Sequence, residues 1–139
     1  MKSFVNLILD MTKMEPKWIF WHCCLLAVNF GGGFFFFSTL EGKLAVSFMI
    51  IGTAIMSYIH SKYGFVRLLG AGHVLWLYLI PHFLILYSSL KPSHFKGWLF
   101  MAALFNGISL VIDIINTIKY LKGDIAPTIK QKTPSTPAA

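Results

Sequence analysis

The chain has 139 residues, of which 56% are hydrophobic and only 12% are charged, and its formal net charge is +7. A soluble domain of this size needs a charged exterior, so the composition argues against one and favours apolar side chains that face lipid. The basic residues lie in the tails and connectors rather than on one face, which makes anionic lipid headgroups the expected counter-charge and argues against nucleic acid as a partner.

Residues 1–16 predict a short amphipathic helix. Phe4, Leu7, Ile8 and Met11 share one helical face, and the opposite face is polar. We expect this helix to lie in the headgroup region of a bilayer and to end near Pro16. A signal peptide is excluded because the apolar core is short and no small-residue cleavage site follows it.

Residues 17–122 predict a bundle of transmembrane helices. Each apolar run is close to the ~20 residues that a helix needs to cross the hydrocarbon core. The four expected spans are residues 18–40, 43–60, 65–89 and 97–120. The connectors between them are short, with Glu41 and Gly42 joining the first two, so neighbouring helices must be antiparallel. The predicted fold is therefore all-α, an integral membrane four-helix up-down bundle preceded by an interfacial amphipathic helix.

The orientation follows from the basic residues. Nine lysines and arginines fall on the side of the two termini and three on the other side. The positive-inside rule then predicts that both termini are cytoplasmic and that the protein is a multi-pass protein of the plasma membrane. Residues 123–139 are rich in Pro, Thr and Lys and lack an apolar face, which predicts a disordered cytoplasmic tail.

The fourth span carries a polar stripe. Asn106, Ser109, Asp113 and Asn116 recur at i, i+3, i+7 and i+10, which places all four on one face of a helix. Lipid cannot satisfy polar groups, so this face must meet other helices.

Counting from the ends of the spans places other polar residues at the depth of this stripe. His73 lies six residues inward of Arg67, and His22 lies five residues inward of Lys17. We expect a layer in the inner leaflet, with Arg67 above it, and a second layer near the middle of the membrane. The predicted intramembrane polar cluster comprises Asp113, His73, Arg67, Asn106, Ser109, Asn116, His22 and Asn29.

This cluster has three interpretations. In the favoured one, Asp113 pairs with Arg67 or His73 and fixes the register of the helices. In the second, Asp113 and His73 carry protons or ions. In the third, histidines such as His22 and His73 hold a haem, although no C-x-x-C-H or compact histidine pair is present. The sequence holds no nucleophile triad or H-E-x-x-H motif, and Cys23 and Cys24 are adjacent, so we expect no catalytic residues, no metal and no disulfide framework.

The glycines predict close helix packing. Gly31, Gly32 and Gly33 are consecutive in the first span, and Gly70 and Gly72 begin the third. Small residues of this kind mediate association of membrane helices within one chain or between chains, so a homo-oligomer or a larger membrane partner is plausible. A proline further along the third span, Pro81, predicts a kink.

The stretches from Arg67 to Trp76, from Asn106 to Asp113 and from Tyr120 to Asp124 resemble small four-helix bacterial inner-membrane proteins of unknown function. The resemblance covers about residues 43–126 and implies a bacterial plasma membrane, but no activity. The leading functional prediction is a non-enzymatic structural or binding module, or an accessory subunit. A small proton- or ion-linked transporter or channel is the alternative, and a haem-binding redox protein is the second alternative.

Overall fold

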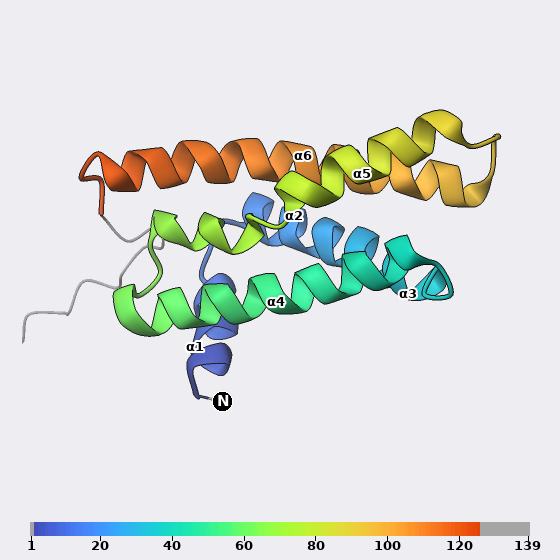
Figure 1. The fold of residues 1–139 in the computed structure, drawn as a ribbon. Helices are drawn as coiled ribbons and strands as arrows, with labels where there is room; N and C mark the ends of the chain where they lie inside the picture. The colour runs from blue at the N-terminus through green and yellow to red at the C-terminus, as the bar shows by residue number, and fades with distance from the viewer. Residues whose placement is uncertain (1, 126–139) are drawn as a thin grey trace, which may run out of the picture.

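The computed structural model describes residues 2–125, which contain six α-helices, a π-helical turn and a 3-10 segment, and no strand (Figure 1). The elements are α1 (Lys2–Met11), α2 (Pro16–Leu26), η1 (Ala27–Gly31), α3 (Gly32–Phe35), α4 (Leu40–Tyr63), η2 (Arg67–His73), α5 (Trp76–Ser89) and α6 (His94–Leu121). The all-α prediction is confirmed for this part of the chain. The predicted disordered tail lies, beyond residue 125, outside the described residues.

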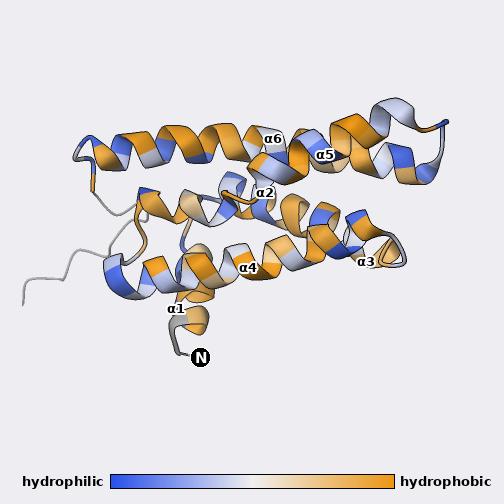
Figure 2. Ribbon diagram, in the orientation of Figure 1, coloured by the Kyte–Doolittle hydropathy of each residue, from blue (hydrophilic) through white to orange (hydrophobic). Residues whose placement is uncertain are grey.

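Three helical stretches are long and apolar enough to cross a membrane. They are Pro16–Phe35, Leu40–Tyr63 and His94–Leu121, and the bent pair formed by η2 and α5 makes a fourth if it is counted as one span. Apolar residues lie on several sides of these helices, and many large ones are exposed, including Phe35, Ile85 and Val111 (Figure 2). This exposure suits lipid rather than water, so the chain is a membrane protein with three or four candidate spans.

The first span and its connector differ from the prediction. The helix that begins at Pro16 continues through η1 and ends at Phe35, before the expected residue 40. Glu41 and Gly42, expected to form the connector, instead lie in the first turn of α4. Thr39 caps that helix because its hydroxyl accepts a hydrogen bond from the Gly42 amide at 3.1 Å, and a carboxylate is favourable at a helix N-terminus.

The third span is broken rather than continuous. The axes of η2 and α5 differ by 45°, and the break falls at residues 74–75. The expected kink at Pro81 is not where the break occurs, because α5 runs through this proline as one helix. Glycines explain the position of the break, since Gly70 and Gly72 weaken a helix and let η2 lie against both α4 and α6.

Apart from α1, the helices run roughly along one long axis, and the molecule has two distinct ends (Figure 1). We call the end where Arg67 forms an ion pair with Asp124 at 3.0 Å the tail end. Gly123, with a φ of 100°, ends α6 there by adopting a left-handed conformation. We call the opposite end, where α5 and α6 are joined by residues 90–93, the far end.

The main core lies towards the far end. Its largest fully buried side chains are Trp76, Phe83, Leu79 and Leu99, which come from α5 and α6. Glycine allows close packing in this core. The Trp98 side chain lies directly against the backbone of Gly32, where an added Cβ would be only 2.1 Å from Nε1 of Trp98. The prediction that glycines allow close packing within the chain is therefore confirmed at Gly32, Gly33, Gly70 and Gly72, whereas a Cβ on Gly31 would meet no atom within 4 Å.

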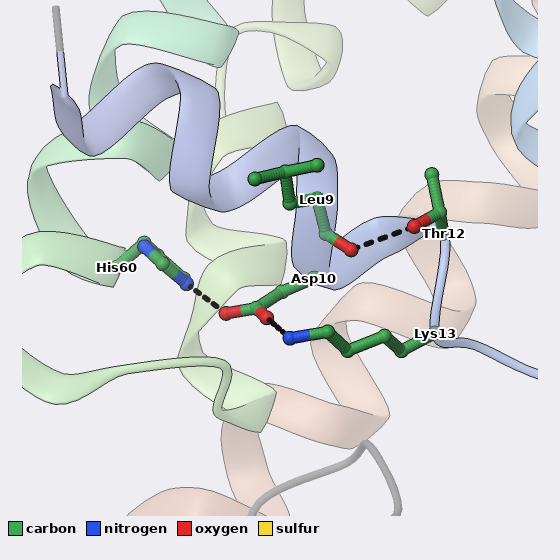
Figure 3. A network of polar contacts seen from close by, with 5 residues as sticks. All are labelled: Leu9, Asp10, Thr12, Lys13 and His60. Atoms are coloured by element: carbon green, nitrogen blue, oxygen red, sulfur yellow. Dashed lines mark hydrogen bonds and ion pairs between the residues drawn. The ribbon is translucent and has the colours of Figure 1, made fainter.

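The N-terminal helix α1 is attached to the tail end and crosses the direction of α4 (Figure 1). Leu7 is only 1% exposed and packs with Ile59, Phe65 and Leu69. On the polar side, Oδ2 of Asp10 lies 2.9 Å from Nε2 of His60, and Oδ1 accepts a hydrogen bond from Lys13 (Figure 3). The Lys13 ammonium and then His60 hold the pKa of Asp10 below its ordinary value of 3.8. The helix is therefore held by one buried leucine and one polar network.

Candidate functional site

A cavity of about 610 Å³ lies at the tail end, between the α1–α2 segment, η2 and α6. Six of the eight polar residues predicted from the sequence line it: His22, Arg67, His73, Ser109, Asp113 and Asn116. Its apolar wall includes Trp18, Trp21, Met56 and Ile112. The structure thus gathers most of the predicted polar cluster around one space that is large enough for a small ligand.

His73 and Asp113 form a close polar pair in the cavity. Nδ1 of His73 lies 2.7 Å from Oδ2 of Asp113, and both side chains are largely buried. The His73 ring stacks on Trp76, with ring centroids 3.9 Å apart and an angle of 13° between the planes. When Asp113 is ionised and His73 is neutral, Nδ1 carries the proton and Nε2 remains an acceptor. This arrangement orients the imidazole as a base or as a ligand.

The pair requires a glycine on η2. A Cβ on Gly70 would lie 2.7 Å from the Cβ of Asp113 and 2.8 Å from its Oδ1. The absence of a side chain at Gly70 therefore lets the carboxylate lie directly against the backbone of η2. Of the two partners expected for Asp113, the structure selects His73.

Arg67 is engaged elsewhere at the mouth of the cavity. Its Nε lies 3.0 Å from Oδ2 of Asp124, and its Nη1 donates to Oδ1 of Asn116 over a long 3.4 Å. The Asp124 side chain is 44% exposed, so this ion pair is in contact with solvent. Arg67 therefore lines the cavity without touching the His73–Asp113 pair through any bond that we observe among the described residues.

A tryptophan that the sequence analysis did not single out connects α2 to the stripe on α6. Nε1 of Trp21 donates a hydrogen bond to Oγ of Ser109 at 2.7 Å, and the indole stacks on Phe105 with centroids 5.2 Å apart. The sequence places Trp21 near the end of a span, which is typical of a belt residue, so its position gave no signal for a buried bond. His22 is fixed on the same helix, since its Nδ1 lies 2.7 Å from the carbonyl oxygen of Trp18.

Asn29 and Asn106 form a separate buried pair outside the cavity. Each amide donates to the other, at 2.7 Å and 2.9 Å, and both residues are completely buried. Nδ2 of Asn29 also donates to the Leu25 carbonyl at 3.0 Å, next to the π-helical turn η1. Thr53, on α4, donates to the Met49 carbonyl of its own helix. The two layers predicted from the sequence are therefore separate in the structure.

Two further pairs of a carboxylate and a histidine escaped the sequence analysis. One is Asp10 with His60 at the tail end, and the other is Glu41 with His82, at 3.2 Å. Each joins residues at least 40 positions apart, so no local spacing announces it. Along the chain from His73 to His82 lie two fully buried apolar side chains of α5, Trp76 and Leu79.

Cofactor and metal binding have limited support in the described residues. Within residues 2–125, no group of three His, Cys, Asp or Glu side chains gathers so as to hold a metal ion. His22 and His73 both line the cavity, and each commits Nδ1 to an oxygen, so Nε2 is the atom that either could offer to a haem iron. The haem hypothesis stays a prediction.

No family model, no curated protein and no solved structure matches this chain. The resemblance to small bacterial inner-membrane proteins therefore stays a prediction, and the functional argument rests on the geometry of the chain itself.

Proposed function

We propose that this chain is a non-enzymatic binding module of the bacterial inner membrane, and that its tail-end cavity holds a small amphipathic ligand. The observation that carries this proposal is the cavity of about 610 Å³ that joins six polar residues of the predicted cluster to an apolar wall. Ligand sites of proteins are typically concave, mostly apolar and furnished with a few convergent polar groups. A purely structural polar cluster would instead be closed, as the Asn29–Asn106 pair is.

The membrane setting belongs to the same proposal. We infer a four-helix up-down bundle in which the bent pair of η2 and α5 is one span, with the tail end in the cytoplasm. Short connectors and the excess of basic residues on the side of the termini support this arrangement. Reporter fusions after residue 125 and within residues 36–39 and 64–66 test it, because a fusion after 125 that is active only outside the cytoplasm would contradict the orientation.

The binding function is tested by photo-crosslinking in cells. A benzoylphenylalanine at Met56, which lines the cavity, should capture a molecule of one defined mass, identified by mass spectrometry of the purified adduct. The matched control places the same probe at Leu104, which is 43% exposed on α6 and should capture a mixture of lipids. If both positions capture the same mixture, the cavity is not a selective binding site.

A second candidate function is proton-linked transport. It is favoured by the His73–Asp113 pair in one half of the bundle and the Glu41–His82 pair in the other. Transport would require the apolar layer between them to open, since Trp76 and Leu79 are fully buried. Asp113→Asn in liposomes should abolish a pH-dependent flux while Asp10→Asn, outside the spans, preserves it. Equal flux in the wild type and in Asp113→Asn would exclude this role for the pair.

A further inference from the structure

An apolar groove on the surface of the bundle adjoins the cavity. This groove, of about 220 Å³, is lined by Lys17, Trp18, Trp21, Ile108 and Ile112. The cavity and the groove share Trp18, Trp21 and Ile112 as wall residues. Ile108 is 44% exposed, so the groove lies on the surface that the bilayer would cover. One molecule could therefore place a polar group in the cavity and a hydrocarbon chain along the groove.

The cations at this site are held by partners that a ligand can replace. Arg67 pairs with the exposed Asp124, and Lys17 pairs with Glu15, whose side chain is 57% exposed. Exposed ion pairs contribute only about 0–1 kcal/mol, so Lys17 can exchange Glu15 for another anion at little cost. The Arg67 side chain is only 27% exposed, and its Nε makes no hydrogen bond in the described structure, so this guanidinium keeps a donor that an anion could use. A guanidinium matches the oxygens of a phosphate better than an ammonium does, because it presents a planar fork of donors. The chemistry of the mouth therefore suits a phosphodiester.

The position of the cavity selects the source of that phosphodiester. Lys17 and Trp18 at the start of α2 mark the headgroup level of the bilayer at the tail end. Basic pockets between helices on the cytoplasmic side are a recurrent way to bind anionic lipid headgroups. A free phosphate would leave the groove unused, and a zwitterionic lipid would bring its own cation towards Arg67 and Lys13.

We propose that the cavity and its groove bind one anionic phospholipid of the cytoplasmic leaflet. Its phosphodiester lies on Arg67, with Lys13 and Lys17 at the mouth, and one acyl chain follows Ile108 and Ile112. This inference rests on the proposed binding function and names the class of its ligand. It assigns Arg67 as the residue that distinguishes this lipid from the rest of the bilayer.

The test is native mass spectrometry of the full chain released from nanodiscs that contain equal amounts of phosphatidylglycerol and phosphatidylcholine. The wild type should retain one phosphatidylglycerol, and Arg67→Gln should lower that retention about tenfold, as loss of a charge-assisted bidentate contact predicts. Asp124→Asn removes the same ion pair but frees Arg67, so it should retain the lipid at least as well. Lys119→Gln removes an exposed base of α6 that does not line the cavity, and it should change nothing. If Arg67→Gln does not fold, Arg67→Lys should still retain less lipid than the wild type.

The outcomes separate the lipid inference from the binding function. Equal retention of the two lipids, or loss with Lys119→Gln as large as with Arg67→Gln, would overturn the lipid inference. Binding of inorganic phosphate alone would also overturn the lipid inference and would assign the site to a soluble anion. This binding would be measured as a change in the fluorescence of Trp18 and Trp21, which line the cavity. A retained non-lipid molecule that Ile112→Trp displaces would overturn the lipid inference while preserving the binding function. If the wild type retains no molecule, and Ile112→Trp gives the same mass spectrum, both the lipid inference and the proposed binding function would be overturned.

Discussion

At the far end of the bundle, Phe83, Leu79 and Leu99 are completely buried and Trp98 lies against the backbone of Gly32, whereas at the tail end the helices surround a cavity of about 610 Å³. Both ends contain a hydrogen-bonded carboxylate and histidine, so polar pairing alone does not explain the difference. The difference lies in the backbone. The far end uses continuous α5 and α6, while the tail end is built from a 3-10 segment and a crossing helix, which fill space less evenly.

This comparison suggests that the far end supplies stability and the tail end supplies binding. Membrane helices gain stability from close van der Waals packing rather than from transfer out of water, because the separated helices still lie in lipid. A tightly packed region is therefore the one where a deletion should be most damaging. A side chain that borders a cavity makes fewer packing contacts, so deleting it should lower the free energy of unfolding less.

The largest effect is expected for Phe83→Ala. The residue is completely buried, and the space left behind should lower the free energy of unfolding in bicelles by about 2–3 kcal/mol, since the cavity term remains even in lipid. Ile112→Ala is the matched change at the tail end, where the side chain already borders a cavity, and it should cost less than about 1 kcal/mol. Equal losses measured by steric trapping would remove the proposed division between the two ends.

The next effect concerns the backbone contact beneath Asp113. Gly70→Ala introduces a Cβ within 3.0 Å of the Cα of Asp113, a backbone atom that cannot move away alone. We expect a loss of about 1–2 kcal/mol, typical of overpacking, and a weaker His73–Asp113 bond visible as a shifted imidazole ¹⁵N resonance. Gly107→Ala is the control on α6, where a Cβ meets no atom within 4 Å, and it should be neutral or stabilising by up to about 1 kcal/mol. If the two variants behave alike, the close approach at Gly70 is not a constraint on the pair.

A smaller effect should come from the buried amide pair between the two ends. A double-mutant cycle of Asn29→Ala and Asn106→Ala should give a coupling of about 1 kcal/mol, within the range for hydrogen bonds between membrane helices. Each single variant leaves the other amide without its partner inside the bundle. Thr53→Ala is the control, because the Thr53 hydroxyl bonds only to its own helix in the described structure, and its coupling to Asn106→Ala should be close to zero.

The sequence predicted the depth of the polar residues better than the course of the backbone. The register of Asn106, Ser109 and Asp113 on one helix follows from a period of 3.6 residues, and the antiparallel arrangement then placed His73 beside Asp113. The break at residues 74–75 was not predicted, because the effect of Gly70 and Gly72 depends on what they meet, whereas the proline that predicted a kink, Pro81, lies inside α5. In the structure, what Gly70 and Gly72 meet is Asp113 and Met56, from two other helices.

The rest of the site could not be predicted because it depends on contacts between distant elements. Nothing local distinguishes Trp21, bonded to Ser109, from Trp18 at the same membrane level. Similarly, the pairing of Asp10 with His60 depends on how α1 folds back across α4. The cavity itself follows from that fold-back, since Leu7, Met11 and Met14 form part of its wall.

The smallest expected effect is the response of α1 to pH, which tests whether the helix is part of the tail end or only adjacent to it. Lys13 and His60 lower the pKa of Asp10, so the carboxylate stabilises docking fully at pH values above its ordinary 3.8 and loses that contribution as the pH falls through the lower folded pKa. The distribution of electron paramagnetic resonance distances between nitroxides at Val5 and Tyr63, both exposed, should be narrow from pH 7 to about 5 and should broaden below pH 3.8.

The control variant Asp10→Asn should broaden this distance distribution modestly at every pH and remove the acid-dependent step. Because Leu7 stays buried, docking should weaken rather than vanish. An acid step that persists in Asp10→Asn would assign the response to other carboxylates and would show that the Asp10–His60 contact does not hold the helix.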